Sequence, residues 1–213
     1  AAIKELRVRS VHNGQWLAVL IEWDDATHND ILRQADFGDQ VAVELPNDPA
    51  AGLPSPMMGN PGGRVTVMQW RAALQRDLEK GEIKVRDAYP NASVDVYPDE
   101  VLTVLDSRSY MGAVSLDNPV SRPLDSAVLD QMAEGWGTMT VKPVQHAKGR
   151  GVWEKGKWRV VITRPLSVDT PNDPKLAAGG ETVAAFAVWE GGSKEVGSRK
   201  AWSNWVPLKL AKE

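Results

Sequence analysis

The sequence predicts a mainly β protein, an antiparallel two-sheet β-sandwich with a few peripheral helices. The first observation is a hairpin, because residues 6–11 and 15–23 alternate apolar and polar side chains on either side of Asn13-Gly14. Asn-Gly between two such runs is the strongest short-range hairpin signal. The second observation is that residues 182–189 are apolar almost throughout, which predicts a central strand buried on both faces.

A second hairpin supports the same fold class. Residues 151–154 and 157–164 flank Lys155-Gly156, a pair suited to a tight turn. Further strands are predicted at residues 40–45, 64–70, 138–143 and 206–210. The chain has 213 residues and no internal repeat, so we expect one domain, residues 1–213.

Two helices are predicted beside the sheets. Residues 71–80 are rich in helix formers and are followed by Gly81, a typical stop signal. Residues 125–134 begin at an acidic N-cap candidate, Asp125, and are followed by Gly135. Their apolar side chains fall on one helical face, so this segment is expected to be the second helix.

Composition excludes several classes of site. A net charge of −3 without a polybasic run argues against nucleic-acid or membrane-surface binding. The absence of cysteine excludes disulfides, iron–sulfur clusters, thiolate zinc sites and covalently attached c-type haem. With three histidines, His12, His28 and His146, a histidine-rich metal cage is not expected. The chain also contains no nucleophile elbow, H-E-x-x-H motif or phosphate-binding glycine loop.

An eighteen-residue segment, residues 46–63, holds five prolines and four glycines around Met57 and Met58. Structureless loops longer than about 12–15 residues are uncommon in compact domains and are usually functional or disordered. Adjacent methionines in such a loop have two interpretations. They fill a hydrophobic gap under the loop, or a thioether serves as a soft ligand for copper or haem iron.

An acidic segment offers a second candidate metal site. Asp24-Asp25 ends a predicted strand and is followed by His28 and Asp30. Carboxylate oxygens in this arrangement suit calcium or another divalent cation. The alternative interpretation is a polar exit from the strand that is stabilised by Asx-turns.

Several motifs, taken in order along most of the chain, resemble one family. They are His12-Asn-Gly14, Pro56-Met-Met-Gly59, Ala133-Glu-Gly-Trp-Gly137, Trp158-Arg-Val-Val-Ile162, Phe186-Ala-Val-Trp189-Glu-Gly-Gly192 and Arg199-Lys200-Ala-Trp202-Ser203. The chain resembles the haem b (gamma) subunit of periplasmic molybdenum enzymes of the dimethyl sulfoxide reductase superfamily. That family includes the subunits of ethylbenzene dehydrogenase, dimethyl sulfide dehydrogenase, and chlorate and selenate reductases.

The resemblance implies one haem b, held without covalent bonds between a methionine and a lysine. On this sequence the two axial ligands of the haem iron are Met58, which directly precedes Gly59, and Lys200. Met57 is the nearest alternative to Met58. With both axial positions occupied by protein, oxygen and substrate have no open site on the iron, which is typical of an electron carrier rather than a catalyst.

The Met58 and Lys200 assignment also suggests roles for several tryptophans and histidines. Trp70, Trp189 and Trp202 lie close in sequence to the proposed ligand segments, so they are expected to line the haem pocket. His28 and His146 are the alternative ligands if the lysine assignment fails.

The resemblance also implies partners and a compartment. The chain is expected to form a heterotrimer with a molybdenum-cofactor catalytic subunit and an iron–sulfur subunit. It would relay electrons between the iron–sulfur subunit and a soluble carrier in the periplasm. The opening Ala1-Ala2 fits a mature end left by signal-peptide cleavage.

Two rival functions suit the same sequence. A secreted carbohydrate-binding β-sandwich would use surface tryptophans as sugar platforms, and the chain has nine tryptophans. A self-standing haem enzyme would need an open position on the iron. Colour separates the first rival from a haem protein, and carbon monoxide binding separates the second from an electron carrier.

Overall fold

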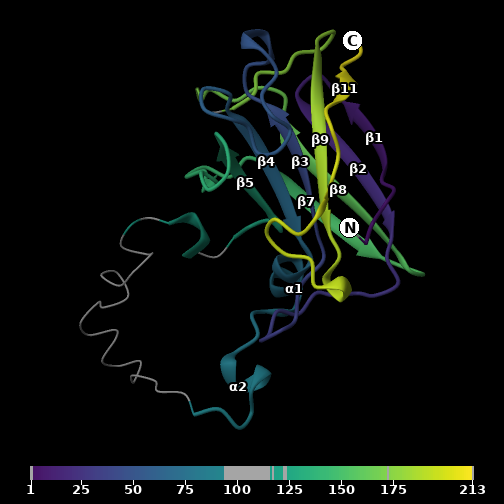
Figure 1. Cartoon of the computed structure of the whole chain (residues 1–213), viewed down its shortest axis with the longest axis vertical. Coiled ribbons are helices and arrows are strands. Elements are labelled where there is room, and N and C mark those ends of the chain that lie inside the picture. Colours follow the sequence, from purple (N-terminus) through teal and green to yellow (C-terminus); the bar gives the residue numbers. More distant parts are fainter. Residues whose placement is uncertain (1, 94–115, 117, 122–123, 172, 213) are drawn as a thin grey trace.

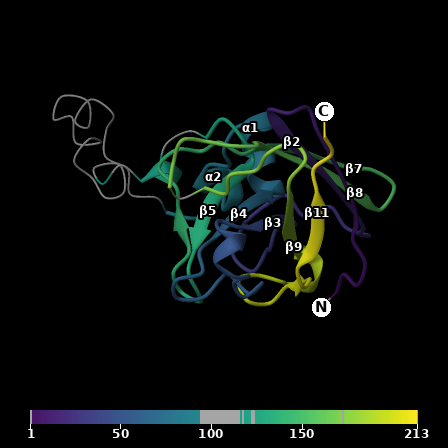
Figure 2. The ribbon, with the colours of Figure 1, turned by 90° about the horizontal axis from the view of Figure 1, so that it is seen from above.

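The computed structural model describes residues 2–93, 116, 118–121, 124–171 and 173–212, and these residues form two antiparallel sheets (Figures 1 and 2). The first sheet has the order β1-β2-β8-β7. The second sheet has the order β10-β9-β3-β4-β5-β6, and β11 also pairs with β9. The strands are β1 (Arg7–His12), β2 (Trp16–Asp24), β3 (Gln40–Pro46), β4 (Val65–Arg71), β5 (Val128–Ala133), β6 (Thr140–Val141), β7 (Lys148–Trp153), β8 (Lys157–Pro165), β9 (Glu181–Trp189), β10 (Ala201–Trp202) and β11 (Val206–Lys209). The predicted fold class is confirmed.

Both predicted hairpins are present in the first sheet. Gly14, in the β1–β2 turn, has φ 78°, and the side chain of Asn13 accepts the backbone N–H of Trp16 at 2.8 Å. In the β7–β8 turn, Lys155 and Gly156 both have positive φ, as the tight hairpin turns of twisted strands require.

The predicted strands of the second sheet are largely confirmed. β9 lies between β3 on one side and β10 and β11 on the other, as expected for a central strand (Figure 1). The strand predicted at residues 138–143 is shorter, because only Thr140 and Val141 pair with β5.

The helix predicted at residues 125–134 is wrong, because this segment forms β5. Asp125 pairs with Lys148 instead of capping a helix, and Ser126 Oγ accepts the backbone N–H of Val128 at 3.2 Å. β5 pairs with β4 over six residues and also with β6, so sheet pairing on both sides outweighs a weak local helix preference. Gly135 does follow the element and has φ 117°.

The helix predicted at residues 71–80 is confirmed as α1 (Ala72–Lys80), which ends at Gly81 with φ 84°. A short helix α2 (Val85–Ala88) follows it. Single 3-10 turns occur at η1 (Pro49–Ala51), η2 (Pro119–Ser121) and η3 (Gly191–Ser193).

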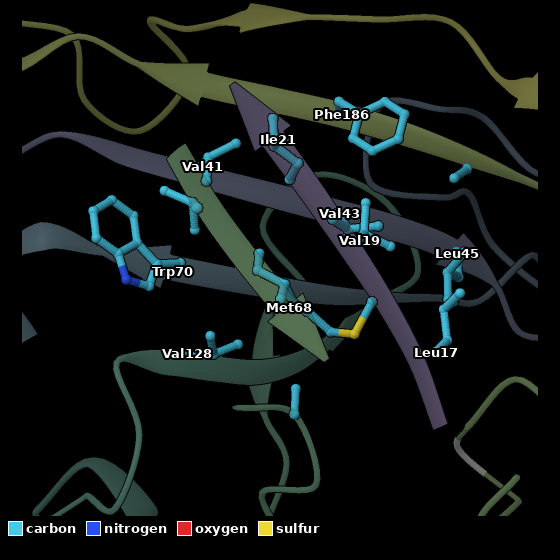
Figure 3. Packing of buried hydrophobic residues seen from close by; sticks show 14 of the residues in the cluster. Leu17, Val19, Ile21, Val41, Val43, Leu45, Met68, Trp70, Val128 and Phe186 are labelled. Atoms are coloured by element: carbon cyan, nitrogen blue, oxygen red, sulfur yellow. The ribbon is translucent and has the colours of Figure 1, made fainter. Parts of the chain in front are cut away.

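The main hydrophobic core lies between the two sheets. Figure 3 shows Met68 and Trp70 of β4 among core side chains of β2 and β3. The Trp70 ring meets the edge of Trp158 at 4.9 Å between centroids, and Trp23 stacks on Trp158 at 6.1 Å. The core face of the second sheet therefore packs in the main core, and a second, smaller cluster of buried residues lies on its opposite face.

No helix within the described part of the chain is long and apolar enough to cross a bilayer.

Candidate functional site

The outer face of the second sheet, which points away from the first sheet, carries small side chains at its centre. Val41 and Val43 face the core, so alternation along β3 places Ala42 and Glu44 on the outer face. Ala42 lies opposite Ala187, and Glu44 lies opposite Ala185. Adjacent alanines make a flat apolar floor, and segments from the loops cover it.

A long loop connects β3 and β4 (Figure 1), and hydrogen bonds within the loop fix its conformation. Ser55 donates its backbone N–H to the Asn60 side chain at 2.9 Å, and Gly59 donates to the Ser55 carbonyl at 2.9 Å. Asn60 and Gly63 then form a two-way bridge. A Cβ on Gly59 would lie 2.5 Å from the Gly63 carbonyl oxygen, so only glycine fits directly after Met58.

Met58 is held in a strained backbone conformation at the edge of the alanine floor. Its φ is 70°, a left-handed value that non-glycine residues rarely adopt and that functional sites often stabilise. Its carbonyl accepts the N–H of Gly135 at 2.7 Å, and its backbone N–H faces the Glu44 carboxyl, where it acts to lower the pKa of that group. The Met58 side chain packs on a cluster of outer-face residues that includes Ala42 and Trp189. Its neighbour Met57 instead donates its backbone N–H to Ser55 Oγ at 3.2 Å.

Lys200 reaches the same face from the segment that leads into β10. Its Nζ lies 5.1 Å from the ring centroid of Trp189, a cation–π distance. Trp189 in turn donates its indole N–H to the Gly197 carbonyl at 3.0 Å, which fixes the segment before Lys200. Burial lowers the pKa of Lys200, and the nearby Glu44 opposes that shift.

Glu44 is the residue on which Met58 and Lys200 converge. Burial raises its pKa to about 8, while the N–H of Met58 and the charge of Lys200 oppose the shift. Glu44 Oε1 is buried and has no hydrogen-bond partner among the described residues. The sequence analysis missed Glu44, although a single carboxyl in the apolar run 41–45 was a usable signal.

Trp205 is a second residue that the sequence analysis missed. Its indole N–H donates to the Pro54 carbonyl at 2.7 Å, and its ring packs on the outer-face cluster with Met58. This contact joins the Met58 loop to the segment that follows Lys200. The segments that carry Met58 and Lys200 therefore both lie over the alanine floor.

The three tryptophans that were expected to line one pocket do not all lie together in the structure. Trp189 lies on the outer face beside Lys200. Trp202 is half exposed at the sheet edge, opposite Ala187 in β9 and so on the same face. Trp70 is fully buried in the core on the other face of β4, away from Met58 and Lys200.

The alternative histidine ligands lie elsewhere. His28 stacks on Trp153 at 5.4 Å and meets the edge of Trp158 at 5.0 Å, on the opposite side of the second sheet from Met58. His146 lies two residues before the start of β7, and its Nε2 is buried without a hydrogen-bond partner in the described chain.

Of the acidic segment, only Asp25 joins a buried carboxyl cluster, defined as Asp25, Asp39 and Glu190, whereas Asp24 pairs with Lys157 and Asp30 with His28. Asp25 Oδ1 accepts the backbone N–H of Thr27 at 3.0 Å. This is the hydrogen bond of an Asx-turn, so the structure agrees with the Asx-turn interpretation of the segment. Asp39 Oδ1 accepts the N–H of Gly191 at 2.9 Å, and its Oδ2 accepts the indole N–H of Trp158 at 3.0 Å. Protein donors thus occupy these oxygens, which ties the loop after β2 to the loop that carries Lys200.

This cluster predicts a pH dependence of stability. Burial raises the pKa of Asp39 to about 7, although backbone N–H groups of Asn29 and Gly191 lower it. In the unfolded chain an aspartate titrates near pH ~4. Between these values the folded protein keeps a proton that the unfolded chain has released, so the free energy of unfolding falls as pH rises from about 4 to about 7.

Urea unfolding of the apoprotein between pH 4.5 and 8 measures this effect. Asp39→Asn should flatten the decline, although it also weakens hydrogen bonds at every pH. Asp36→Asn is the matched control, since Asp36 pairs with Arg33 at the surface and should leave the slope unchanged. A decline of equal slope in Asp39→Asn would refute the assignment.

An apolar floor, closed by a thioether and a partly desolvated amine, suits a flat apolar group with two axial ligands. The chain belongs to the ethylbenzene dehydrogenase family, whose model matches residues 1–201. This membership confirms the resemblance drawn from the sequence motifs.

Two relatives match nearly the whole chain. The gamma subunit of chlorate reductase from Ideonella dechloratans is 26% identical over 213 residues, 99% of this chain and 66% of the relative. A putative respiratory nitrate reductase heme subunit, ORF7, from Haloferax mediterranei is 25% identical over 205 residues, 96% of this chain and 55% of the relative. The chain therefore spans between about half and two thirds of the length of these relatives.

Proposed function

We propose that this chain is a non-catalytic electron-transfer subunit that binds one haem b, with Met58 and Lys200 as axial ligands. The observation that carries the proposal is their convergence on Glu44 and Trp189, although they come from distant parts of the sequence. The two relatives support it, since one is named as a gamma subunit of a reductase and the other as a heme subunit.

The residues at the site fit haem. The alanines at positions 42, 185 and 187 leave the sheet surface flat, and Met58 and Lys200 supply one soft and one amine donor. A lysine binds iron only as the free amine, and with a reference pKa near ~10.4 its deprotonation at pH 7 costs about 4–5 kcal/mol. Burial of Lys200 already lowers its pKa, so part of this cost is met before any metal is present.

When bound, haem supplies a one-electron redox centre. A thioether from Met58 favours the ferrous state, whereas a hard amine from Lys200 opposes it. Trp189 and Trp205 line the site, and their hydrogen bonds to Gly197 and Pro54 fix the segments that carry Lys200 and Met58. With both axial positions filled, the site favours electron transfer over oxygen chemistry.

The proposal extends to partners and compartment. The chain would relay electrons between an iron–sulfur subunit and a soluble carrier, as part of a heterotrimer with a molybdenum-cofactor catalytic subunit in the periplasm. The family resemblance and the reductase-subunit names of the two relatives support this step. Purification from native cells should recover larger metal-containing subunits from the periplasmic fraction. A solitary cytoplasmic protein would contradict it.

Haem binding itself has a simple test. The purified protein should show a Soret band and one equivalent of haem per chain, and acidified organic solvent should extract all of the colour because the chain has no cysteine. A carbohydrate-binding module would be colourless as purified. Haem that stays on the polypeptide, or a stoichiometry well below one after full loading, would refute the proposal.

A further inference from the structure

Arg71 is a partly buried cation on the outer face of the second sheet, next to the proposed haem site. Its Nη2 donates to Gln69 Oε1 at 2.9 Å, which places both side chains on one face of β4. In the sheet register Arg71 lies opposite Gln40, and Gln40 lies opposite Trp189. Arg71 therefore shares a row with the tryptophan beneath Lys200.

No carboxylate of the described chain pairs with Arg71, and its buried Nε has no hydrogen-bond partner there. Burial lowers the pKa of this guanidinium, yet an arginine stays charged in proteins. Arg164, which is fully buried, has a counter-ion, because its Nη2 lies 3.7 Å from Asp173. A partly desolvated cation whose buried Nε has no partner is costly, so the retention of Arg71 points to an anion that comes from outside the chain.

The neighbours of Arg71 form a polar edge beside the alanine floor. Gln131 donates to Gln69 at 3.0 Å, and Gln69 donates to Gln40 at 2.7 Å. This amide chain fixes Gln69 Oε1, which in turn orients the guanidinium. The outer face thus has an apolar centre and one cationic edge, the pattern that a flat apolar ligand with carboxylates on one side would match.

We propose that Arg71 binds the propionate carboxylates of haem and so fixes which edge of the macrocycle points toward the end of β4. The inference rests on the proposed function, because it assigns one further contact of the same site. Arginine binds a carboxylate through two parallel N–H donors, so Arg71 sets orientation as well as affinity.

The test compares ferric haem b with its dimethyl ester, in which both carboxylates are capped. Each is loaded into the wild-type chain and Arg71→Gln, and its release to excess apomyoglobin is followed by absorbance. Capping the propionates should speed release from the wild type about 10- to 100-fold, and Arg71→Gln should speed release of haem b similarly. The two changes together should give no further loss, because they remove the same contact.

Two more variants complete the design. Arg71→Lys keeps the charge but not the paired donors, so it should give an intermediate rate and serves if Arg71→Gln does not fold. Arg150→Gln, at an exposed arginine on β7, should behave as the wild type. Additive effects of capping and substitution, with the six-coordinate spectrum intact, would overturn this inference alone. A wild-type chain that takes up no haem would overturn the proposed function as well.

Discussion

Lys200→Ala should convert a low-spin, six-coordinate haem into one with an open position, and the ferrous form should then bind carbon monoxide. The methyl group of alanine cannot reach or coordinate the iron, so water or an added ligand takes its place. The wild type should lose its low-spin spectrum as pH falls far enough to protonate the amine, because protons compete with iron for Lys200. The variant should lack that acid transition.

Absorption spectra across a pH titration, with and without carbon monoxide, measure both effects. Lys209→Ala is a suitable control, because Lys209 is exposed on β11 and pairs with Glu181 at 3.2 Å. Met58→Ala should behave differently, since loss of the soft donor lowers the reduction potential while the amine remains bound. An unchanged spectrum in Lys200→Ala, together with a changed one in His28→Ala, would refute the lysine assignment.

Lys142→Met should lower the free energy of unfolding by about 3–5 kcal/mol, a large part of the ~5–15 kcal/mol of a typical domain. Lys142 is buried at one end of the core and contacts Asp173 at 2.7 Å, Asp130 at 3.1 Å and Thr66 at 2.9 Å. Arg164 of the first sheet joins the cluster through Asp173. Removal of the lysine leaves two buried carboxylates with one remaining cation.

Chemical denaturation of the apoprotein gives the change directly. Lys209→Ala again serves as the comparison, because an exposed ion pair typically contributes about 0–1 kcal/mol. Equal, small effects of the two substitutions would show that the buried cluster does not stabilise the fold.

The β-hairpins and the central strand were predictable because alternation and turn residues are local signals. β5 was not predictable in this way, because Asp125 and Gly135 also mark a helix and only pairing with β4 and β6 decides between the two. Short strands such as β6 depend in the same way on what lies beside them. Local sequence signals therefore predict the hairpins of the first sheet better than they predict β5 and β6, which lie at one edge of the second sheet.

At the site, the ligand candidates came from motif resemblance, whereas their surroundings depend on strand register. Glu44, Trp205 and Arg71 were missed because alternation along one strand does not show which strands are neighbours. Trp70 illustrates the same point, since it is adjacent to Arg71 in sequence but points to the opposite face of β4. A one-residue step in a strand is enough to move a side chain from the site to the core.

X-ray absorption at the iron edge of the haem-loaded protein tests the axial ligation most directly. The account predicts one sulfur and five nitrogen neighbours of iron, four from the macrocycle and one from Lys200. Met58→Leu should remove the sulfur, and the volume-conserving Met57→Leu should keep it. Six nitrogen neighbours in the wild type, or loss of the sulfur in Met57→Leu with retention in Met58→Leu, would contradict the account.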